Sequence, residues 1–184
     1  QMNVNQNLRW DKRYKPTLEQ QNFDEINYAI SQNKDLVVLP ETAFTTPLNR
    51  NEILFQKLKE LSTKIDIITG AIYIENDQIY NASYHFSNGV VQVAKKVVLV
   101  PFGEEIPFPK FIVDFINKVF YNGAQDYSKA SEPTDFVIKG EKFRNAICYE
   151  ATTDKIFENL GNTEYMVAIS NNAWFTPSIE PTLQ

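Results

Sequence analysis

Cysteine and histidine are almost absent from this 184-residue chain, which has one of each, Cys148 and His85. A single cysteine cannot form a disulfide within the chain, so the redox compartment is left open. One histidine and one cysteine without a tight cluster of acidic residues are also a poor basis for a metal site. The sequence therefore predicts no metal and no cofactor.

Long apolar runs and an excess of basic charge are missing as well. No run of about 18 apolar residues occurs, so no membrane-spanning helix is expected within this segment. The formal net charge of −5 provides neither a basic surface for nucleic acid nor a polybasic arm for anionic lipid. What remains is a chain of ordinary apolar content, long enough to bury the core of one domain.

Helix and strand patterns alternate along the chain, which is typical of the α/β class. Helices are expected over 17–33 and 51–62, and the second has apolar residues at helical spacing, Ile53, Leu54, Leu58 and Leu61. Strands are expected over 36–39, 65–74, 80–86, 90–94, 136–138, 143–148 and 166–170, with a short helix over 154–160 closed by Gly161. In some of these strands polar and apolar residues alternate, and others are wholly apolar. This mixture predicts a sheet covered by helices on one side and by another sheet on the other.

The segment 106–121 is unusually aromatic and allows two interpretations. It could be a helix that packs in the core. It could also be a lid or arm that contacts lipid or an apolar substrate.

Three chemically useful side chains stand at the ends of apolar strands. Cys148 follows one strand and precedes a plausible helix start, Glu41 follows the strand over 36–39, and Lys96 opens the segment 96–104. A thiol is a weak nucleophile unless its proton is removed, and Glu41 could remove it as a general base. Lys96 and the backbone N–H of Tyr149 could stabilise the resulting oxyanion.

Simpler interpretations exist for each of these residues. Cys148 could be a small buried apolar side chain. The charged side chains at strand ends could be exposed surface groups; these are Glu41, Lys96, Glu104 and Glu150. His85 falls in a hairpin, so a Cys-His pair is the weaker catalytic arrangement.

The order of Glu41, Lys96 and Cys148 resembles the Glu-Lys-Cys triad of the nitrilase superfamily. The surrounding motifs are more specific and resemble the apolipoprotein N-acyltransferase family. They are Leu39-Pro40-Glu41-Thr42-Ala43-Phe44, Lys96-x-x-Leu99-Val100-Pro101-Phe102-Gly103-Glu104, Cys148-Tyr149-Glu150, Ser170-Asn171-Asn172-Ala173-Trp174-Phe175 and the opening Gln1-x-Asn3-x-x-Gln6-x-x-x-Trp10. The resemblance covers nearly the whole chain. Asn172 stands where the family commonly has Asp.

This resemblance implies a nitrilase-like four-layer α-β-β-α sandwich over residues 1–184. The chain would be a catalytic domain that lacks its C-terminal strands and flanking membrane helices. The whole protein would then lie in the bacterial inner membrane, with this domain on the periplasmic side.

The resemblance also implies a ping-pong acyl transfer. Cys148 would take an acyl chain from a phospholipid as a thioester, and the amine of a diacylglyceryl-cysteine apolipoprotein would then accept it. Glu104 and Glu150 would be supporting carboxylates, and Tyr149 would supply an oxyanion N–H. Trp10 would lie on the substrate side, although a tryptophan in the core or at an interface is an equally good interpretation.

Two alternatives belong to other functional classes. A soluble amidase of the same superfamily would use water as the second nucleophile and would need no lipid. A non-catalytic binding or assembly domain would keep the fold and would be indifferent to the loss of Cys148.

Overall fold

Two β-sheets packed face to face form the centre of the computed structural model, which describes residues 13–101, 104 and 127–171. Trp10, Asn172 and the aromatic segment 106–121 lie outside these residues. The first sheet contains β1 (Leu36–Val38), β2 (Phe44–Pro47), β3 (Asp66–Glu75), β4 (Gln78–Ser87) and β5 (Val90–Lys95). The second sheet contains β6 (Asp135–Ile138), β7 (Glu141–Ile147) and β8 (Tyr165–Ile169).

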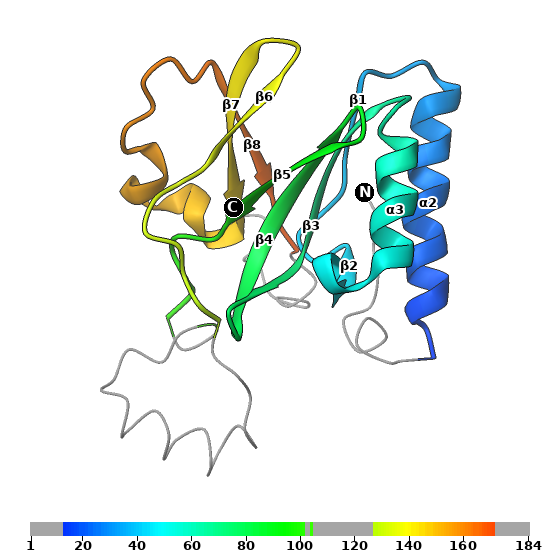
Figure 1. The fold of residues 1–184 in the computed structure, drawn as a ribbon. Coiled ribbons are helices and arrows are strands. Elements are labelled where there is room, and N and C mark those ends of the chain that lie inside the picture. The colour runs from blue at the N-terminus through cyan, green and yellow to red at the C-terminus, as the bar shows by residue number, and fades with distance from the viewer. Residues whose placement is uncertain (1–12, 102–103, 105–126, 172–184) are drawn as a thin grey trace, which may run out of the picture.

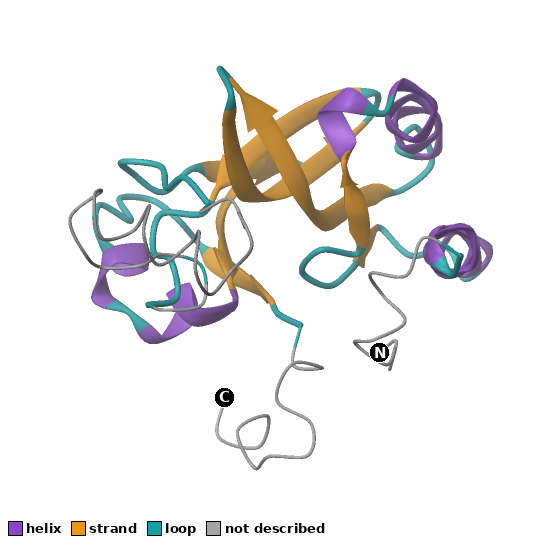
Figure 2. Cartoon of the chain, turned by 90° about the horizontal axis from the view of Figure 1, so that it is seen from below, coloured by secondary structure: helices purple, strands orange, loops and turns teal. Residues whose placement is uncertain are grey.

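Helices cover the outer faces of both sheets (Figures 1 and 2). The helices α2 (Lys15–Ser31) and α3 (Glu52–Leu61) lie side by side against the first sheet. The short 3-10 helices η2 (Cys148–Thr152) and η3 (Asp154–Phe157) lie beyond the second sheet, while η1 (Leu48–Arg50) leads into α3. The layers are therefore helix, sheet, sheet and 3-10 helix, which confirms the expected α/β sandwich.

The core follows from the alternation of side chains along the strands. On β4, Tyr84 and Phe86 face the helices and pack with Phe23 of α2 and Leu58 of α3. A second apolar cluster fills the space between the sheets, where Ile68 of β3 meets residues of β6, β7 and β8. Each sheet is thus buried on both faces over its central strands, as the mixed hydrophobic pattern predicts.

The strand order places two chain segments against the same edge of β3. Both β1 and β2 run parallel to β3, with Leu36–Val38 beside Asp66–Ile68 and Phe44 beside Ala71. The residues between β1 and β2 therefore turn away from the sheet and return to the same edge. On the other side of β3, β4 and β5 continue the sheet by antiparallel pairing.

Three details differ from the sequence-based expectations. Ile53 is 82% exposed, because it lies about 100° around the helix from Leu54, which is buried. The helix expected over 154–160 is shorter and of the 3-10 type, ending at Phe157, and Asn159 and Gly161 beyond it have positive φ angles. Strand β2 was not expected, since Phe-Thr-Thr-Pro is short and contains a proline.

Candidate active site

Glu41 lies in the turn between β1 and β2, and the close approach of Gly70 makes this turn possible. A Cβ atom at Gly70 would lie 2.6 Å from both the Glu41 Cα and the Thr42 nitrogen. The Gly70 N–H donates to the carbonyl of Pro40 at 3.2 Å, and Thr42 has a positive φ of 48°. The backbone therefore turns sharply over a glycine, and the Glu41 side chain is directed into the protein with 7% exposure.

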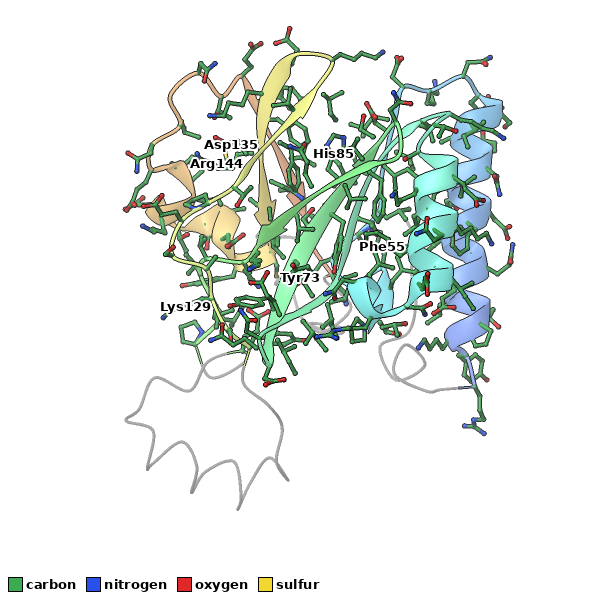
Figure 3. All side chains as sticks on the ribbon, in the orientation of Figure 1. Phe55, Tyr73, His85, Lys129, Asp135 and Arg144 are labelled. Atoms are coloured by element: carbon green, nitrogen blue, oxygen red, sulfur yellow. The ribbon has the colours of Figure 1, made fainter. Side chains whose placement is uncertain are left out.

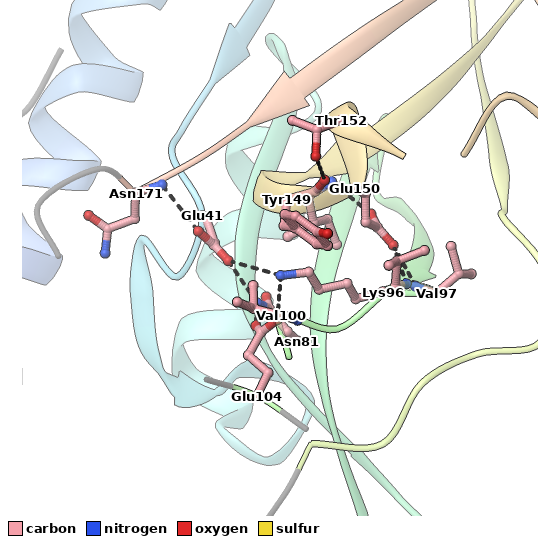
Figure 4. Close-up of polar contacts among 12 residues, drawn as sticks. Glu41, Asn81, Lys96, Val97, Val100, Glu104, Tyr149, Glu150, Thr152 and Asn171 are labelled. Carbon is pink, nitrogen blue, oxygen red and sulfur yellow. Dashed lines mark hydrogen bonds and ion pairs between the residues drawn. The ribbon is translucent and has the colours of Figure 1, made fainter. Parts of the chain in front are cut away.

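Lys96 directly follows strand β5 and is completely buried, with a relative exposure of 0%. Its Nζ donates to Glu104 Oε2 at 2.7 Å and lies 3.7 Å from Glu41 Oε1 (Figure 4). Burial opposes the charged form of Lys96, but the carboxylates of Glu104 and Glu41 outweigh it and the pKa of Lys96 is raised. The side chain therefore remains an ammonium group at neutral pH.

Glu104 is held in position from three directions. Besides Lys96, the Val100 N–H donates to its Oε2 at 3.0 Å, and the Asn81 amide donates to its Oε1 at 2.9 Å. The same Asn81 nitrogen donates to Glu41 Oε1 at 2.8 Å. The second oxygen of Glu41 accepts the Asn171 N–H at 3.1 Å, just beyond β8. The acidic cluster thus joins segments from both sheets.

Cys148 begins η2 at the end of β7 and has a positive φ of 56°. A non-glycine residue in this region costs on the order of 1–3 kcal/mol and persists where the surrounding structure enforces it. Burial and the Glu41 carboxylate raise the pKa of the thiol, whereas a hydrogen bond with Ser170 and the charge of Lys96 oppose this shift. The resting side chain is therefore a thiol, and a neighbouring base must take its proton before or during nucleophilic attack.

Glu150 connects the cysteine segment to the lysine segment. Its Oε2 accepts the Ile147 N–H at 2.8 Å, and its Oε1 accepts the N–H groups of Val97 and Val98, the latter at 3.1 Å. Burial raises the pKa of Glu150, and the three backbone donors oppose this shift. One buried carboxylate therefore fixes the backbone on both sides of the site, immediately before Cys148 and immediately after Lys96 (Figure 4).

The structure brings together six of the seven residues expected from the sequence. Glu41, Lys96, Glu104 and Glu150 are not exposed surface charges, because each is buried or held by internal hydrogen bonds. Tyr149 follows Cys148 and is 37% exposed at the surface of this region. The seventh residue, Trp10, lies outside the described residues.

Two further residues border the cluster and were not expected from the sequence. Asn81 is 2% exposed, and a signal was available: Asn81, Ser83 and His85 are polar side chains at alternate positions of a strand that is otherwise apolar. Tyr127 is the other, and burial together with the charges of Glu104 and Glu41 raises its pKa to about 12. No local pattern marks Tyr127, which approaches Glu104 only through the fold.

His85 does not contribute to this cluster. It lies between the two sheets, where its ring contacts Phe136 and Phe143, and Gln92 Oε1 is 3.2 Å from its Nδ1. Its contacts are therefore with the interface of the two sheets, and among the described residues no hydrogen bond or ion pair joins it to Cys148. Within the described ranges, no group of three or more His, Cys, Asp or Glu side chains is arranged to hold a metal ion.

Of the helices that the structure describes, none combines the length and the apolar character needed to cross a bilayer.

The amino-acid sequence is similar to those of known proteins. No family model matches the chain. It is 47% identical to an apolipoprotein N-acyltransferase of Wolinella succinogenes, covering 98% of this chain and 44% of that protein. Apolipoprotein N-acyltransferases of Campylobacter jejuni and Helicobacter pylori are each 40% identical, over 98% and 97% of this chain. The chain spans less than half the length of these relatives, at 40–44%.

Solved structures identify the fold. A CN-hydrolase superfamily protein of Xanthomonas campestris superposes with a TM-score of 0.62 at 15% identity, covering 88% of this chain and 63% of that one. A nitrilase-superfamily protein of Saccharomyces cerevisiae superposes with a TM-score of 0.60 at 21% identity, covering 85% and 59%. The chain is therefore a homologue of the apolipoprotein N-acyltransferases over nearly its whole length, built on the fold of the nitrilase, or carbon-nitrogen hydrolase, superfamily.

Proposed function

We propose that this chain is the catalytic domain of an apolipoprotein N-acyltransferase, with Glu41, Lys96 and Cys148 as its catalytic residues. The observation that carries the proposal is the wholly buried ammonium of Lys96, held by two carboxylates beside a thiol whose pKa responds to both Glu41 and Lys96. A buried cation of this kind stabilises negative charge far better than an exposed one.

The first half-reaction forms a thioester. Cys148 Sγ attacks the carbonyl carbon of a phospholipid ester while Glu41 takes the thiol proton. The oxyanion of the tetrahedral intermediate faces the Lys96 ammonium and the Tyr149 backbone N–H. When the intermediate collapses, the ester C–O bond breaks, the proton on Glu41 passes to the leaving oxygen, and a lysophospholipid departs.

The second half-reaction transfers the acyl chain to nitrogen. The α-amine of a diacylglyceryl-cysteine apolipoprotein attacks the thioester, and Glu41 accepts a proton from the attacking nitrogen. Collapse breaks the C–S bond, and this proton returns to the sulfur of Cys148. An amine attacks a thioester more readily than an ester, so the covalent step makes an otherwise slow transfer feasible.

The supporting residues have separate tasks in this mechanism. Glu104 holds the ammonium of Lys96 at 2.7 Å. Glu150 holds the backbone on both sides of the site, including the Ile147 amide that precedes Cys148. In the full-length protein, flanking membrane helices and the segment 106–121 would bring the site to the lipid. Trp10 would contact substrate. The proposed location is the periplasmic side of the bacterial inner membrane.

The test is the intact mass of the protein after incubation with phospholipid vesicles. The protein carries its native flanking sequence, because the relatives are more than twice as long as this chain. We expect an added acyl mass that hydroxylamine removes and that is absent from Cys148→Ala. Glu41→Gln should slow adduct formation by about 10²–10⁴-fold, the usual contribution of a general base. Glu158→Gln, which changes an exposed carboxylate, serves as the matched control.

Two other outcomes would replace the proposal. Hydrolysis of small amides without an acyl adduct would identify a soluble amidase of the same superfamily. Absence of both activities, with Cys148 reacting only on unfolding, would identify a non-catalytic domain.

A further inference from the structure

Asn81 has contacts with three parts of the candidate active site. Its side-chain nitrogen donates one hydrogen bond to Glu41 Oε1 at 2.8 Å and another to Glu104 Oε1 at 2.9 Å. Its backbone carbonyl accepts the Lys96 N–H at 2.9 Å. One residue of β4 thus touches both carboxylates and the backbone of the lysine between them (Figure 4).

The charges explain why such a residue is needed. Glu41 and Glu104 are like charges that approach the same nitrogen atom, and Lys96 supplies one positive charge for the two of them. An amide group has two N–H donors on one nitrogen, so it can serve both carboxylates at once without adding charge. Hydrogen bonds to ionised carboxylates are stronger than those between neutral groups and favour the charged form.

We propose that Asn81 is a positioning residue that holds the Glu41 and Glu104 carboxyl groups apart, so that Glu41 is available to Cys148 and Glu104 to Lys96. The inference deepens the function proposed above and rests on it for the identity of the reaction. It does not make Asn81 a catalytic residue, because the side chain acts through the two carboxylates.

Asparagine is suited to this position because its alternatives each fail in one respect. Aspartate has the same shape but offers oxygen atoms where the two carboxylates need donors. Alanine removes both donors and leaves a small cavity in a buried place. The titratable groups around the amide are Glu41, Glu104, Lys96, Cys148 and Tyr127.

The test compares Asn81→Asp with Asn145→Asp. Both residues are buried and lie in the layer between the sheets, but Asn145 donates to the Ser83 hydroxyl and not to a carboxylate. The measured quantity is the rate of Cys148 alkylation by iodoacetamide as a function of pH, in the protein with its native flanking sequence. This reaction needs no lipid and no acyl acceptor.

We expect Asn81→Asp to slow alkylation at neutral pH by about ten-fold and to move the pH profile up by about one unit, since added negative charge opposes thiolate formation. Asn145→Asp should unfold at a lower denaturant concentration, yet its folded fraction should keep the wild-type profile. Asn81→Ala removes the donors without adding charge and provides the same comparison if Asn81→Asp does not fold. Asn81→Ala should also slow alkylation, because Glu41 without the Asn81 donor is no longer held where it takes the thiol proton.

Wild-type pH profiles in both folded Asn81 variants would overturn the proposal and leave Asn81 a packing residue. The result is separable from the function proposed above. If the wild-type protein forms no acyl adduct but substitution of Asn81 still shifts the pH profile of alkylation, the acyltransferase function is rejected. The positioning role of Asn81 is then retained.

Discussion

Gly70 shows how a single hydrogen atom can decide the position of a proposed catalytic base. The turn that carries Glu41 passes so close to β3 that a Cβ at residue 70 would meet the Glu41 Cα at 2.6 Å, a separation that real Cβ atoms do not reach. Both neighbours at this distance are backbone atoms, so no side chain can rotate away. Glycine is required here for space alone.

Gly70→Ala should therefore displace Glu41 and damage the site. We expect overpacking to lower the free energy of unfolding by about 1–3 kcal/mol. The displacement of Glu41 should also lower the rate of Cys148 alkylation. Urea unfolding and the alkylation rate measure the two effects.

Gly89→Ala is the matched control, since Gly89 has a φ of 77° in a hairpin and open space around it. It should cost about 1 kcal/mol and leave alkylation unchanged. Equal effects of the two variants on reactivity would contradict this explanation.

At the scale of elements, local patterns predicted most strands and both α-helices to within a few residues. Leu54 and Leu58 are spaced to make one helical face, and the β4–β5 hairpin is signalled by Ser87-Asn88-Gly89. The same patterns identified Glu41, Lys96 and Cys148 as residues at the ends of strands. The spacing of apolar residues predicts helices and strands because it shows which face of each element is buried.

What the sequence could not predict depends on contacts between distant segments. Asn81 meets Glu41 across 40 positions and Glu104 across 23. Two of the three backbone donors to Glu150, those of Val98 and Val97, are also 52 and 53 positions away. Strand β2 also depends on a distant segment. Phe44–Pro47 is a strand because it pairs with the part of the β3 edge that β1 does not cover. No local rule specifies these partners.

Arg144 connects β7 to the segment that follows the cysteine. Its guanidinium pairs with Asp135 at 2.6 Å and donates to the carbonyls of Ile156 at 2.9 Å, Glu158, and Asn159 at 3.2 Å (Figure 3). These carbonyls lie in and after η3, so the arginine fixes the chain that leaves the candidate site. Only a planar group with five donors can make this set of bonds.

Arg144→Met should destabilise the protein by about 3–5 kcal/mol, since it leaves a partly buried carboxylate without its main partner. Arg144→Lys should recover only part of this loss. The control is Lys142→Met, because Lys142 also pairs with Asp135, at 2.8 Å, but is one-third exposed. Its removal should cost less than about 1 kcal/mol. Chemical denaturation distinguishes the two positions, and similar losses at both would show that the arginine bonds to η3 are unimportant.

At the scale of the whole molecule, the two sheets share the apolar cluster between them, and the His85 ring contacts Phe136 and Phe143 of that cluster (Figure 3). Burial lowers the pKa of His85, whereas the hydrogen bond with Gln92 and the nearby Asp66 oppose this shift. The histidine is therefore neutral in the folded protein at pH 7. The polar row Asn81, Ser83 and His85 runs along one face of β4, so the candidate site and this histidine share the layer between the sheets.

The sandwich as a whole should therefore lose stability as the pH falls below about 6.5, the ordinary pKa of histidine. In this window the unfolded chain binds a proton that the folded protein excludes, so the free energy of unfolding decreases with falling pH until the lower folded pKa is reached. Urea unfolding from pH 7.5 to 5 measures this slope in the wild type and in His85→Phe, whose aromatic ring can pack against Phe136 and Phe143. Glu150 and the other carboxylates titrate in both proteins, so the difference between the two curves isolates the histidine. A slope that is unchanged in His85→Phe would show that His85 is not the source of the acid sensitivity.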